Sequence, residues 1–214
     1  MKGRAWTRRW FTDAAQMTIE LEDERRSLTR VLLGSPWHAE VLATLRDVCG
    51  EGAWIGAGFV RNAVWDQMHG RAPELPDDVD VLIHDPANTG DREADLEQEL
   101  AARLPAVPWS VRNQARMHLK HGDAPYPGLA EAMRRWPETA TAVAVRLDGA
   151  QGLWILAPFG LGDLMRGVLR PAEDSARCRK AFQERVARKG WRDRWPDLLS
   201  DEPWPADMSD FGED

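Results

Sequence analysis

The stretch Gly56–Asn62 (GAGFVRN), followed by Asp78–Val81 (DVDV), decides the fold expected for this chain of 214 residues. The first stretch begins at the end of a short apolar run, Trp54–Gly56, which is typical of a buried strand, and turns through two glycines into an apolar helix expected over 59–68. The second alternates apolar and acidic residues, which is typical of a strand. The sequence therefore predicts a strand, a glycine turn, a helix and a second strand.

Asp78 and Asp80 form the first candidate site. Residues two apart on a strand project to the same face, so the two carboxylates can share a divalent cation. Mg²⁺ in nucleotide sites takes one or two carboxylates together with phosphate oxygens. The glycine turn, about twenty residues earlier, offers a helix N-terminus and backbone N–H groups to phosphate. An Asp-x-Asp pair alone is also common at ordinary solvent-facing strand ends, but its order after the glycine turn predicts a site for metal and triphosphate.

Hydrophobic periodicity predicts helices on either side of these strands. The expected helices are 14–33, 37–49, 91–103, 128–135 and 175–189, and the further expected strands are 109–112, 139–147 and 153–157. Asp148 and Gly149 lie between the last two strands and are typical of a hairpin turn. The chain length fits one mixed domain with terminal extensions.

Two blocks of sequence resemble a known family. In order, they are GAGFVRN (56–62), GR (70–71) and DVDV (78–81), then RR (134–135), TATAVAV (139–145), APFGL (157–161) and DL (163–164). They resemble the head domain of CCA-adding enzymes and bacterial poly(A) polymerases, which belong to the polymerase beta-like nucleotidyltransferase superfamily.

The chain also resembles a small bacterial nucleotidyltransferase family (DUF925) over about 37–196. The phrases that carry this resemblance are RNAVWD (61–66), VRNQARMH (111–118), WPETATAVAVR (136–146) and APFGL (157–161). The resemblance implies an α+β fold of the polymerase beta-like nucleotidyltransferase type, with a mixed sheet flanked by helices, N-terminal helices and a C-terminal helix. We therefore expect an N-terminal helical extension at 1–36, the nucleotidyltransferase domain at 37–196 and a loose acidic tail at 197–214.

The resemblance implies transfer of a nucleoside monophosphate from a nucleoside triphosphate to an acceptor, with Mg²⁺ or Mn²⁺ as cofactor. Asp78 and Asp80 would be the catalytic and metal-binding residues. The residues expected to bind the nucleotide are Gly56, Ala57, Gly58, Arg61, Asn62, Arg112, Asn113, Arg116, Glu138 and Thr139. The acceptor is a small molecule, a protein or an RNA. We do not expect CCA addition, because the chain has no room for the neck, body and tail that measure a tRNA end.

Three positions depart from the head-domain pattern. The turn carries Ala57 between its glycines, Asn62 replaces an aspartate, and Ser110 stands where a third acid is expected. These departures leave open a second hypothesis, a catalytically weak nucleotide-sensing or RNA-binding adaptor of the same fold. A third hypothesis is a partner in a toxin–antitoxin pair, since small proteins of this superfamily occur in such pairs.

Two candidate elements keep two interpretations each. Glu138 either lies near the site or forms a cap or salt bridge at the start of a strand. The polar segment Arg112–His118 either recognises triphosphate or acceptor, or forms a structural hydrogen-bond network. Neither Cys49 and Cys178 nor His118 and His121 have metal-ligand spacing, so we assign the cysteines to reduced structural thiols and expect no zinc site.

The composition limits the classes of partner. A net charge of −7 argues against broad, non-specific nucleic-acid binding, which depends on Lys and Arg neutralising phosphates. The basic run from Arg170 to Arg194 is either a solvated helix face or a local binding face. No run approaches the ~20 apolar residues that cross a bilayer, so we expect a cytoplasmic protein without a membrane partner.

Overall fold

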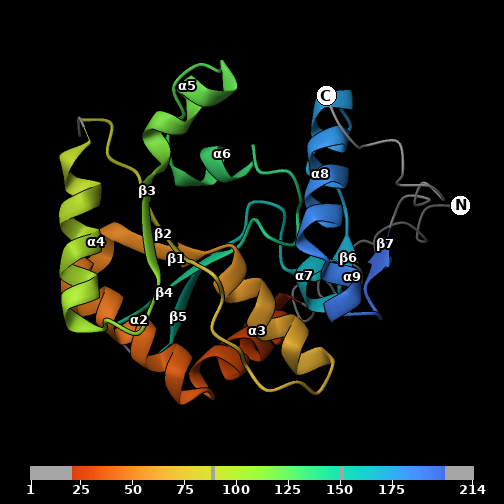
Figure 1. Ribbon diagram of the computed structural model, residues 1–214, viewed down its shortest axis with the longest axis horizontal. Coiled ribbons are helices and arrows are strands. Elements are labelled where there is room, and N and C mark those ends of the chain that lie inside the picture. The colour runs from red at the N-terminus through yellow and green to blue at the C-terminus, as the bar shows by residue number, and fades with distance from the viewer. Residues whose placement is uncertain (1–20, 88–89, 150–151, 201–214) are drawn as a thin grey trace, which may run out of the picture.

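A five-stranded mixed sheet forms the centre of the computed structural model, which describes residues 21–87, 90–149 and 152–200 (Figure 1). The strands are β1 (Ala53–Gly56), β2 (Val79–Ile83), β3 (Trp109–Asn113), β4 (Ala144–Leu147) and β5 (Leu153–Leu156). Their order is β3-β2-β1-β4-β5, and only the β2/β3 pair is parallel among these neighbours. The α+β class and the mixed sheet are confirmed.

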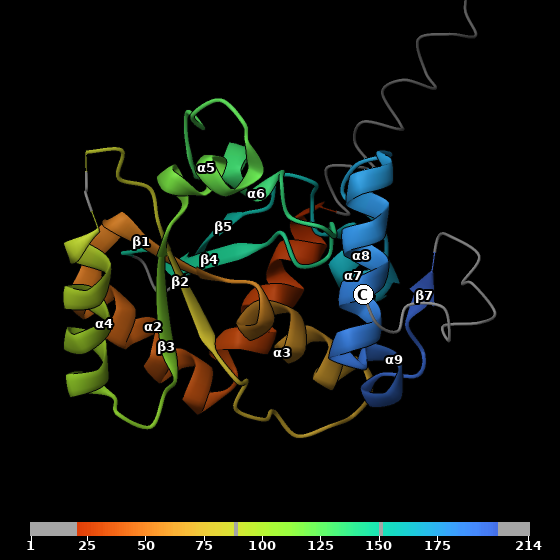
Figure 2. The same cartoon turned by 45° about the horizontal axis from the view of Figure 1, so that its top comes forward.

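The two faces of the sheet differ in how they are covered. Helices α2 (Pro36–Cys49) and α3 (Gly58–Met68) lie on one side, and the short helices α5 (Met117–His121) and α6 (Leu129–Met133) lie on the other (Figure 2). The first side holds the large core, to which a helix over 21–33 also contributes Leu28 and Leu32. The second side holds only a small cluster around Leu82 and Met133. The thinly covered face is therefore the one with room for a site.

The alternation in β2 distributes its side chains between these faces. Val79, Val81 and Ile83 join the large core, whereas Leu82 belongs to the small cluster on the other face. Because side chains alternate along a strand, Asp80 projects to the same face as Leu82. The hydrophobic pattern of this strand thus directs a carboxylate to the open face.

Helix α4 (Asp91–Arg103) protects the edge of the sheet at β3. Two of its carboxylates accept hydrogen bonds from edge-strand backbone N–H groups: Glu97 from Val111 at 3.0 Å and Glu93 from Asn113 at 2.9 Å. An uncovered edge strand presents unpaired N–H groups to other chains. These glutamates satisfy two such groups and fix the strand against the helix.

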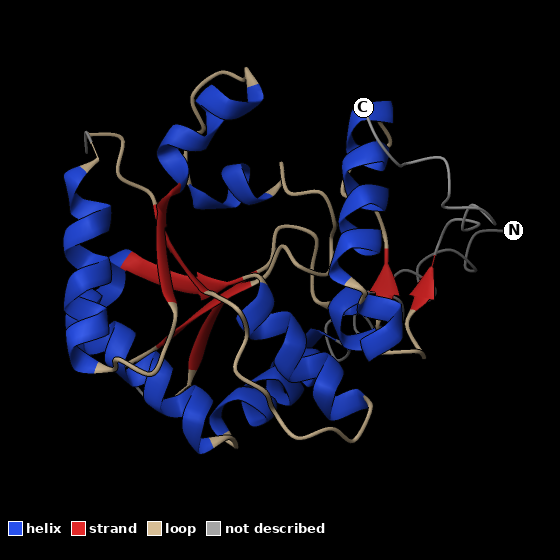
Figure 3. Ribbon diagram, viewed as in Figure 1, coloured by secondary structure: helices blue, strands red, loops and turns tan. Residues whose placement is uncertain are grey.

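The C-terminal segment forms a separate wall beside the sheet. It contains α7 (Gly162–Arg166), α8 (Ala176–Lys189), α9 (Trp191–Arg194) and a parallel pair of two-residue strands, β6 (Val168–Leu169) and β7 (Leu199–Ser200), apart from the main sheet (Figure 3). Ser175 caps α8, because its side chain accepts a hydrogen bond from the Cys178 N–H.

Aromatic packing and one buried carboxylate hold this wall against α3. Trp65 packs edge-on against Trp191 and Trp195. The Asp66 carboxylate, 1% exposed, accepts hydrogen bonds from Trp195 Nε1 at 2.9 Å and from Arg194 Nη2 at 3.0 Å. These contacts join residues about 130 positions apart and so place α8 across from the sheet.

Most of the predicted elements are present, with one clear correction. The strand expected over 139–147 begins only at Ala144, because 139–143 forms tight turns with bonds from Ala142 N to Thr139 O and from Val143 N to Thr141 O. The alternating Thr and Ala pattern resembled a half-buried strand, but every residue from 138 to 143 is buried. The expected helix over 128–135 is shortened to α6.

Other boundaries agree more closely or remain untested. The helix expected over 91–103 has those limits, and β4 and β5 form the expected antiparallel hairpin. The first helix prediction lies partly outside the described residues, as do the ends of the predicted extension and tail. The division into three regions therefore stays a prediction. None of the helices in the described part of the chain has the length and apolarity needed to cross a membrane.

Candidate active site

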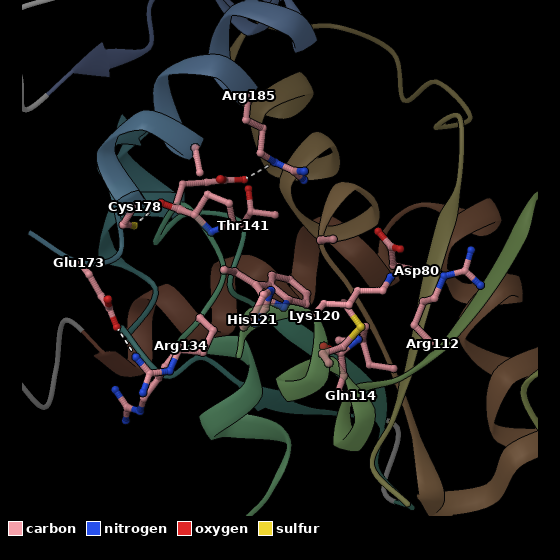
Figure 4. Close-up of a pocket in the computed structure, with 18 of the residues that line it drawn as sticks. Asp80, Arg112, Gln114, Lys120, His121, Arg134, Thr141, Glu173, Cys178 and Arg185 are labelled. Carbon is pink, nitrogen blue, oxygen red and sulfur yellow. Dashed lines mark hydrogen bonds and ion pairs between the residues drawn. The ribbon is translucent and has the colours of Figure 1, made fainter. Parts of the chain in front are cut away.

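A cleft of about 560 Å³ opens on the thinly covered face of the sheet (Figure 4). One wall comes from the β1–α3 turn and β2, a second from the end of β3 with α5, and a third from α8 and the segment around Glu138. The cleft therefore collects side chains from the centre of the sheet and from the C-terminal wall.

Asp78 and Asp80 both line the cleft. The strand begins at Val79, so Asp78 lies exposed just before it, while Asp80 is half-buried within it. Burial, and then the Asp78 carboxylate, raise the pKa of Asp80 to about 6, and the nearby Arg185, Arg112 and Arg61 oppose this shift. Two carboxylates held close in a partly desolvated site favour a bound cation.

The glycine turn lies at the N-terminus of α3. Ala57 occupies a strained conformation for a residue with a side chain, with φ 51° and ψ −123°. Gly56 lies behind it, where a Cβ would come within 3.0 Å of Leu82 Cδ1 and 3.1 Å of the Val143 carbonyl oxygen. A side chain at position 56 would therefore force its neighbours to move by a few tenths of an ångström, while Ala57 and Gly58 form the part of the turn that lines the cleft.

A buried cluster of charged residues forms the floor between this turn and α8. Glu138 is fully buried, and its Oε1 accepts a hydrogen bond from Arg185 Nε at 2.9 Å. Arg61 donates to Thr141 Oγ1 and Asn62 Oδ1, and its guanidinium lies 4.4 Å from the centre of the Trp191 ring. Burial lowers the pKa of Arg61 to about 10, and Glu138 partly offsets this effect.

This cluster is incompletely satisfied. Arg61 Nε and Glu138 Oε2 are buried atoms with no hydrogen-bond partner among the described residues. Buried polar atoms are normally paired, because an unmet hydrogen bond costs free energy. These unmet groups lie at the base of a cleft, beside a carboxylate pair and a helix N-terminus, which makes this region the candidate functional site.

A family model described as nucleotidyltransferase matches residues 45–199. The chain belongs to this nucleotidyltransferase family. A solved structure described as a CCA-adding enzyme head domain is 27% identical, with a TM-score of 0.73; the match covers 83% of this chain and 96% of that one. The resemblance to the head domain is therefore confirmed.

Two larger structures share the fold at lower identity. A tRNA-processing enzyme is 19% identical with a TM-score of 0.53, and the match covers 78% of this chain and 45% of that chain. A CCA-adding enzyme with ATP is 18% identical with a TM-score of 0.51, and the match covers 81% and 41% respectively. This nucleotidyltransferase thus spans less than half of each of these two. A search of curated protein sequences found no match.

Part of the expected site of the nucleotidyltransferase comes together in the cleft. The sequence-predicted residues that line it are Asp78, Asp80, Ala57, Gly58, Arg61, Arg112 and Glu138. Both interpretations of Glu138 hold at once, since it lines the cleft and forms a salt bridge, with Arg185 rather than at a strand start.

The other predicted residues have contacts outside the cleft lining. Asn62 accepts a hydrogen bond from Arg61, and Thr139 Oγ1 donates to Asp163 at 2.7 Å. Asn113 hydrogen-bonds through its side chain with the backbone of Asp85, and Arg116 pairs with Glu93 of α4. Gly56 packs behind the turn. The segment 112–118 therefore has features of both interpretations: Arg112, Gln114 and Met117 line the cleft, while Asn113 and Arg116 bond to Asp85 and Glu93.

Sequence reasoning missed the contribution of α8 to the candidate site. Arg177, Ala181, Arg185 and Lys189 all line the cleft and are spaced four residues apart, which places them along one helix face. This spacing was visible in the basic run, where a solvated face and a binding face were both considered. Only the packing of the C-terminal wall against α3, through Trp191 and Trp195, shows which way that face points.

Proposed function

We propose that this cleft binds a nucleoside triphosphate with a divalent cation and transfers the nucleoside monophosphate to an acceptor hydroxyl. The observation that carries the proposal is the position of Asp78 and Asp80 beside the N-terminal turn of α3, in one cleft with cationic side chains. Family membership supports nucleotidyl transfer as the reaction class.

In this proposal the triphosphate lies over the β1–α3 turn. The backbone N–H groups at the start of α3 and the positive end of its dipole favour phosphate oxygens. Arg185 extends from the opposite wall, and it is the first among the cations that oppose the raised pKa of Asp80. With one guanidinium nitrogen bonded to Glu138, its other donors are oriented for an anion.

The carboxylate pair suits Mg²⁺ or Mn²⁺. The described residues contain no group of three or more His, Cys, Asp or Glu side chains able to hold a metal. A cation at Asp78 and Asp80 would therefore complete its shell with phosphate oxygens and water, as Mg²⁺ does in nucleotide sites. When bound, the metal would neutralise phosphate charge and favour in-line displacement.

The transfer exchanges one phosphorus–oxygen bond for another. The acceptor oxygen forms a bond with the α-phosphorus, the bond from the α-phosphorus to the bridging oxygen of the β-phosphate breaks, and pyrophosphate leaves. The hydroxyl proton passes to water. The protein's part is to orient the triphosphate through the turn and Arg185 and to exclude other geometries, since such reactions depend mainly on positioning and electrostatics.

One observation favours a second candidate, the catalytically weak nucleotide-sensing adaptor. Ser110 is the β3 residue in register with Asp80, so the neighbouring strand supplies a hydroxyl at the position where a third acid was expected. The adaptor would bind the same ligand without transferring it.

Calorimetry and labelling separate these candidates. Titration with ATP, CTP, GTP and UTP, each with Mg²⁺ or with EDTA, should show metal-dependent binding of at least one triphosphate. Absence of binding at millimolar concentration would remove the proposal. Incubating the protein with cell extract and α-³²P-labelled nucleotide should then label an acceptor. Binding without any labelled product would favour the adaptor. Asp80→Asn is the control that should abolish label transfer.

A further inference from the structure

The two neighbours of β2 divide the cleft into two sides. On the β1 side lie the glycine turn and the start of α3, where the proposed function places the triphosphate. On the β3 side lie Arg112, Gln114 and then α5. In-line displacement requires the acceptor oxygen to approach the α-phosphorus opposite to the leaving pyrophosphate. With pyrophosphate on the β1 side, the acceptor enters from the β3 side.

Gln114 is the most informative residue on that side. It is only 4% exposed, yet it lines the cleft. Its side-chain amide makes no hydrogen bond with the described residues, and its polar atoms are not among the buried unpaired ones, so they are open to the cleft. The amide of the adjacent Asn113, in contrast, both donates and accepts. An amide that makes no hydrogen bond inside the protein and is open to a cleft can bond to water or to a ligand there. The amide is therefore positioned to recognise a polar group in the cleft.

Two cations flank this amide. Arg112 is exposed and uses one guanidinium nitrogen to donate to the Val111 carbonyl, which leaves its other donors accessible. In the projection of Figure 4, the Asp80 carboxylate lies between Arg112 and Arg185. Lys120 of α5 also lines the cleft. This side of the cleft thus carries positive charge of its own, apart from the glycine turn.

His121 adds a hydrogen-bond acceptor of defined tautomer. Tyr126 Oη donates its single proton to Asp123 Oδ2 at 2.6 Å, so His121 Nδ1, 2.9 Å from that oxygen, must be the donor. The neutral ring therefore keeps a lone pair on Nε2. The charged groups around the ring are Asp123, Arg177, Arg135 and Lys120. A neutral imidazole beside Lys120 can accept a hydrogen bond from a hydroxyl.

We propose that the end of β3 and α5 form an acceptor subsite for a small hydroxyl compound that carries a phosphate or carboxylate group. Arg112 and Lys120 bind the anionic group, and Gln114 fixes its orientation. We propose a small acceptor, since the cleft of about 560 Å³ holds the triphosphate as well and the anion-binding groups lie within it. This inference rests on the proposed function, since it uses the direction of the leaving pyrophosphate.

The test is a titration of the full chain, saturated with Mg²⁺ and a non-hydrolysable triphosphate analogue. The probes are glycerol 3-phosphate and glycerate, glycerol as the uncharged match, and a short oligoribonucleotide with a free 3′-hydroxyl. The Gln114 side-chain amide signal, assigned with Gln114→Leu, is followed by nitrogen-15 NMR. We expect at least one anionic probe to shift this signal and to bind at least ten-fold more tightly than glycerol; which one does so separates phosphate from carboxylate.

Arg112→Gln should lower the affinity for the anionic probe at least ten-fold and change the affinity for the triphosphate less than two-fold. Arg103→Gln, an exposed charge at the end of α4, is the matched control and should change neither affinity. The subsite is wrong if the triphosphate binds but no small probe shifts Gln114, if only the oligoribonucleotide does, or if Arg112→Gln weakens both ligands equally. Failure of the triphosphate to bind would instead remove the proposed function and the subsite with it.

Discussion

Helix α3 carries two buried charged residues, Arg61 and Asp66, which meet the C-terminal wall in different ways. Both oxygens of Asp66 accept hydrogen bonds, from Trp195 and Arg194. Arg61 keeps an unpaired Nε, and its neighbour Glu138 keeps an unpaired Oε2, among the described residues. Arg194 Nε, beside Asp66, also lacks a partner among the described residues, so incomplete pairing occurs in both clusters. Their position differs: five residues apart on one helix, the Asp66 cluster fastens α3 to the C-terminal wall, and the Arg61 cluster lines the cleft.

The largest effect should come from Asp80→Asn, in the cleft. Loss of metal stabilisation of ~3–4 kcal/mol slows nucleotidyl transfer ~10²–10³-fold. In EDTA the melting temperature should stay the same or rise, because the variant removes a carboxylate that burial and Asp78 disfavour in its charged form. Melting scans with and without Mg²⁺ and triphosphate, beside the labelling assay, measure both effects. Asp78→Asn is the companion variant. A variant that melts earlier, with transfer reduced only in proportion to folded protein, would mean that Asp80 is structural.

Asp66→Asn should lower the melting temperature and leave triphosphate binding nearly unchanged. Breaking a buried charge pair by removing one partner destabilises proteins by about 3–5 kcal/mol, and for a chain of this size each kcal/mol lowers the melting temperature by about 2–4 °C. Triphosphate affinity, measured well below the melting temperature, should remain within two-fold of wild type. A large loss of affinity in folded protein would show that the two clusters on α3 are not separate in function.

His38 offers a pH-dependent test of the packing around Asp66. It packs against Phe59 of α3, and burial lowers its pKa to about 4, with Asp66 opposing the shift. As pH falls below about 6.5, His38 gains a proton in the unfolded chain but stays neutral in the folded chain. The free energy of unfolding therefore decreases until about pH 4. The full loss is at most about 3 kcal/mol. His38→Gln should show a shallower decline in chemical denaturation between pH 7 and 4.5. Equal slopes for both proteins would contradict the assignment.

The smallest effect concerns the strained turn. Ala57→Gly relieves a positive φ that costs about 1–3 kcal/mol, while glycine adds about 0.5–1 kcal/mol of unfolded-state entropy. A net gain of about 1 kcal/mol should raise the melting temperature by about 2–4 °C. Triphosphate affinity measured in parallel shows whether the strain also serves binding. A lower melting temperature would indicate that the turn is not strained in the folded protein.

Local patterns were sufficient for much of the fold. The apolar run into GAGFVRN predicted β1, the turn and α3, and the alternation around Asp80 predicted β2, because these signals depend on neighbouring residues. The same alternation misled at 139–143, where complete burial in the finished fold replaces the strand with turns. Short elements such as α5 and α7, each of five residues, have too few turns to show a period.

The sequence by itself determined the family, the sheet with its helices, and the pairing of Asp78 with Asp80 behind a glycine turn, because each follows from residues close together in the chain. Only the tertiary structure decided that Arg185 joins Glu138, 47 positions earlier, and that Gln114 rather than Asn113 faces the cleft. Both depend on long-range packing: the tryptophans and Asp66 place α8, and α4 fixes the orientation of β3. A linear pattern shows which side chains could carry chemistry, but the direction in which an element presents them is set by what covers its other face.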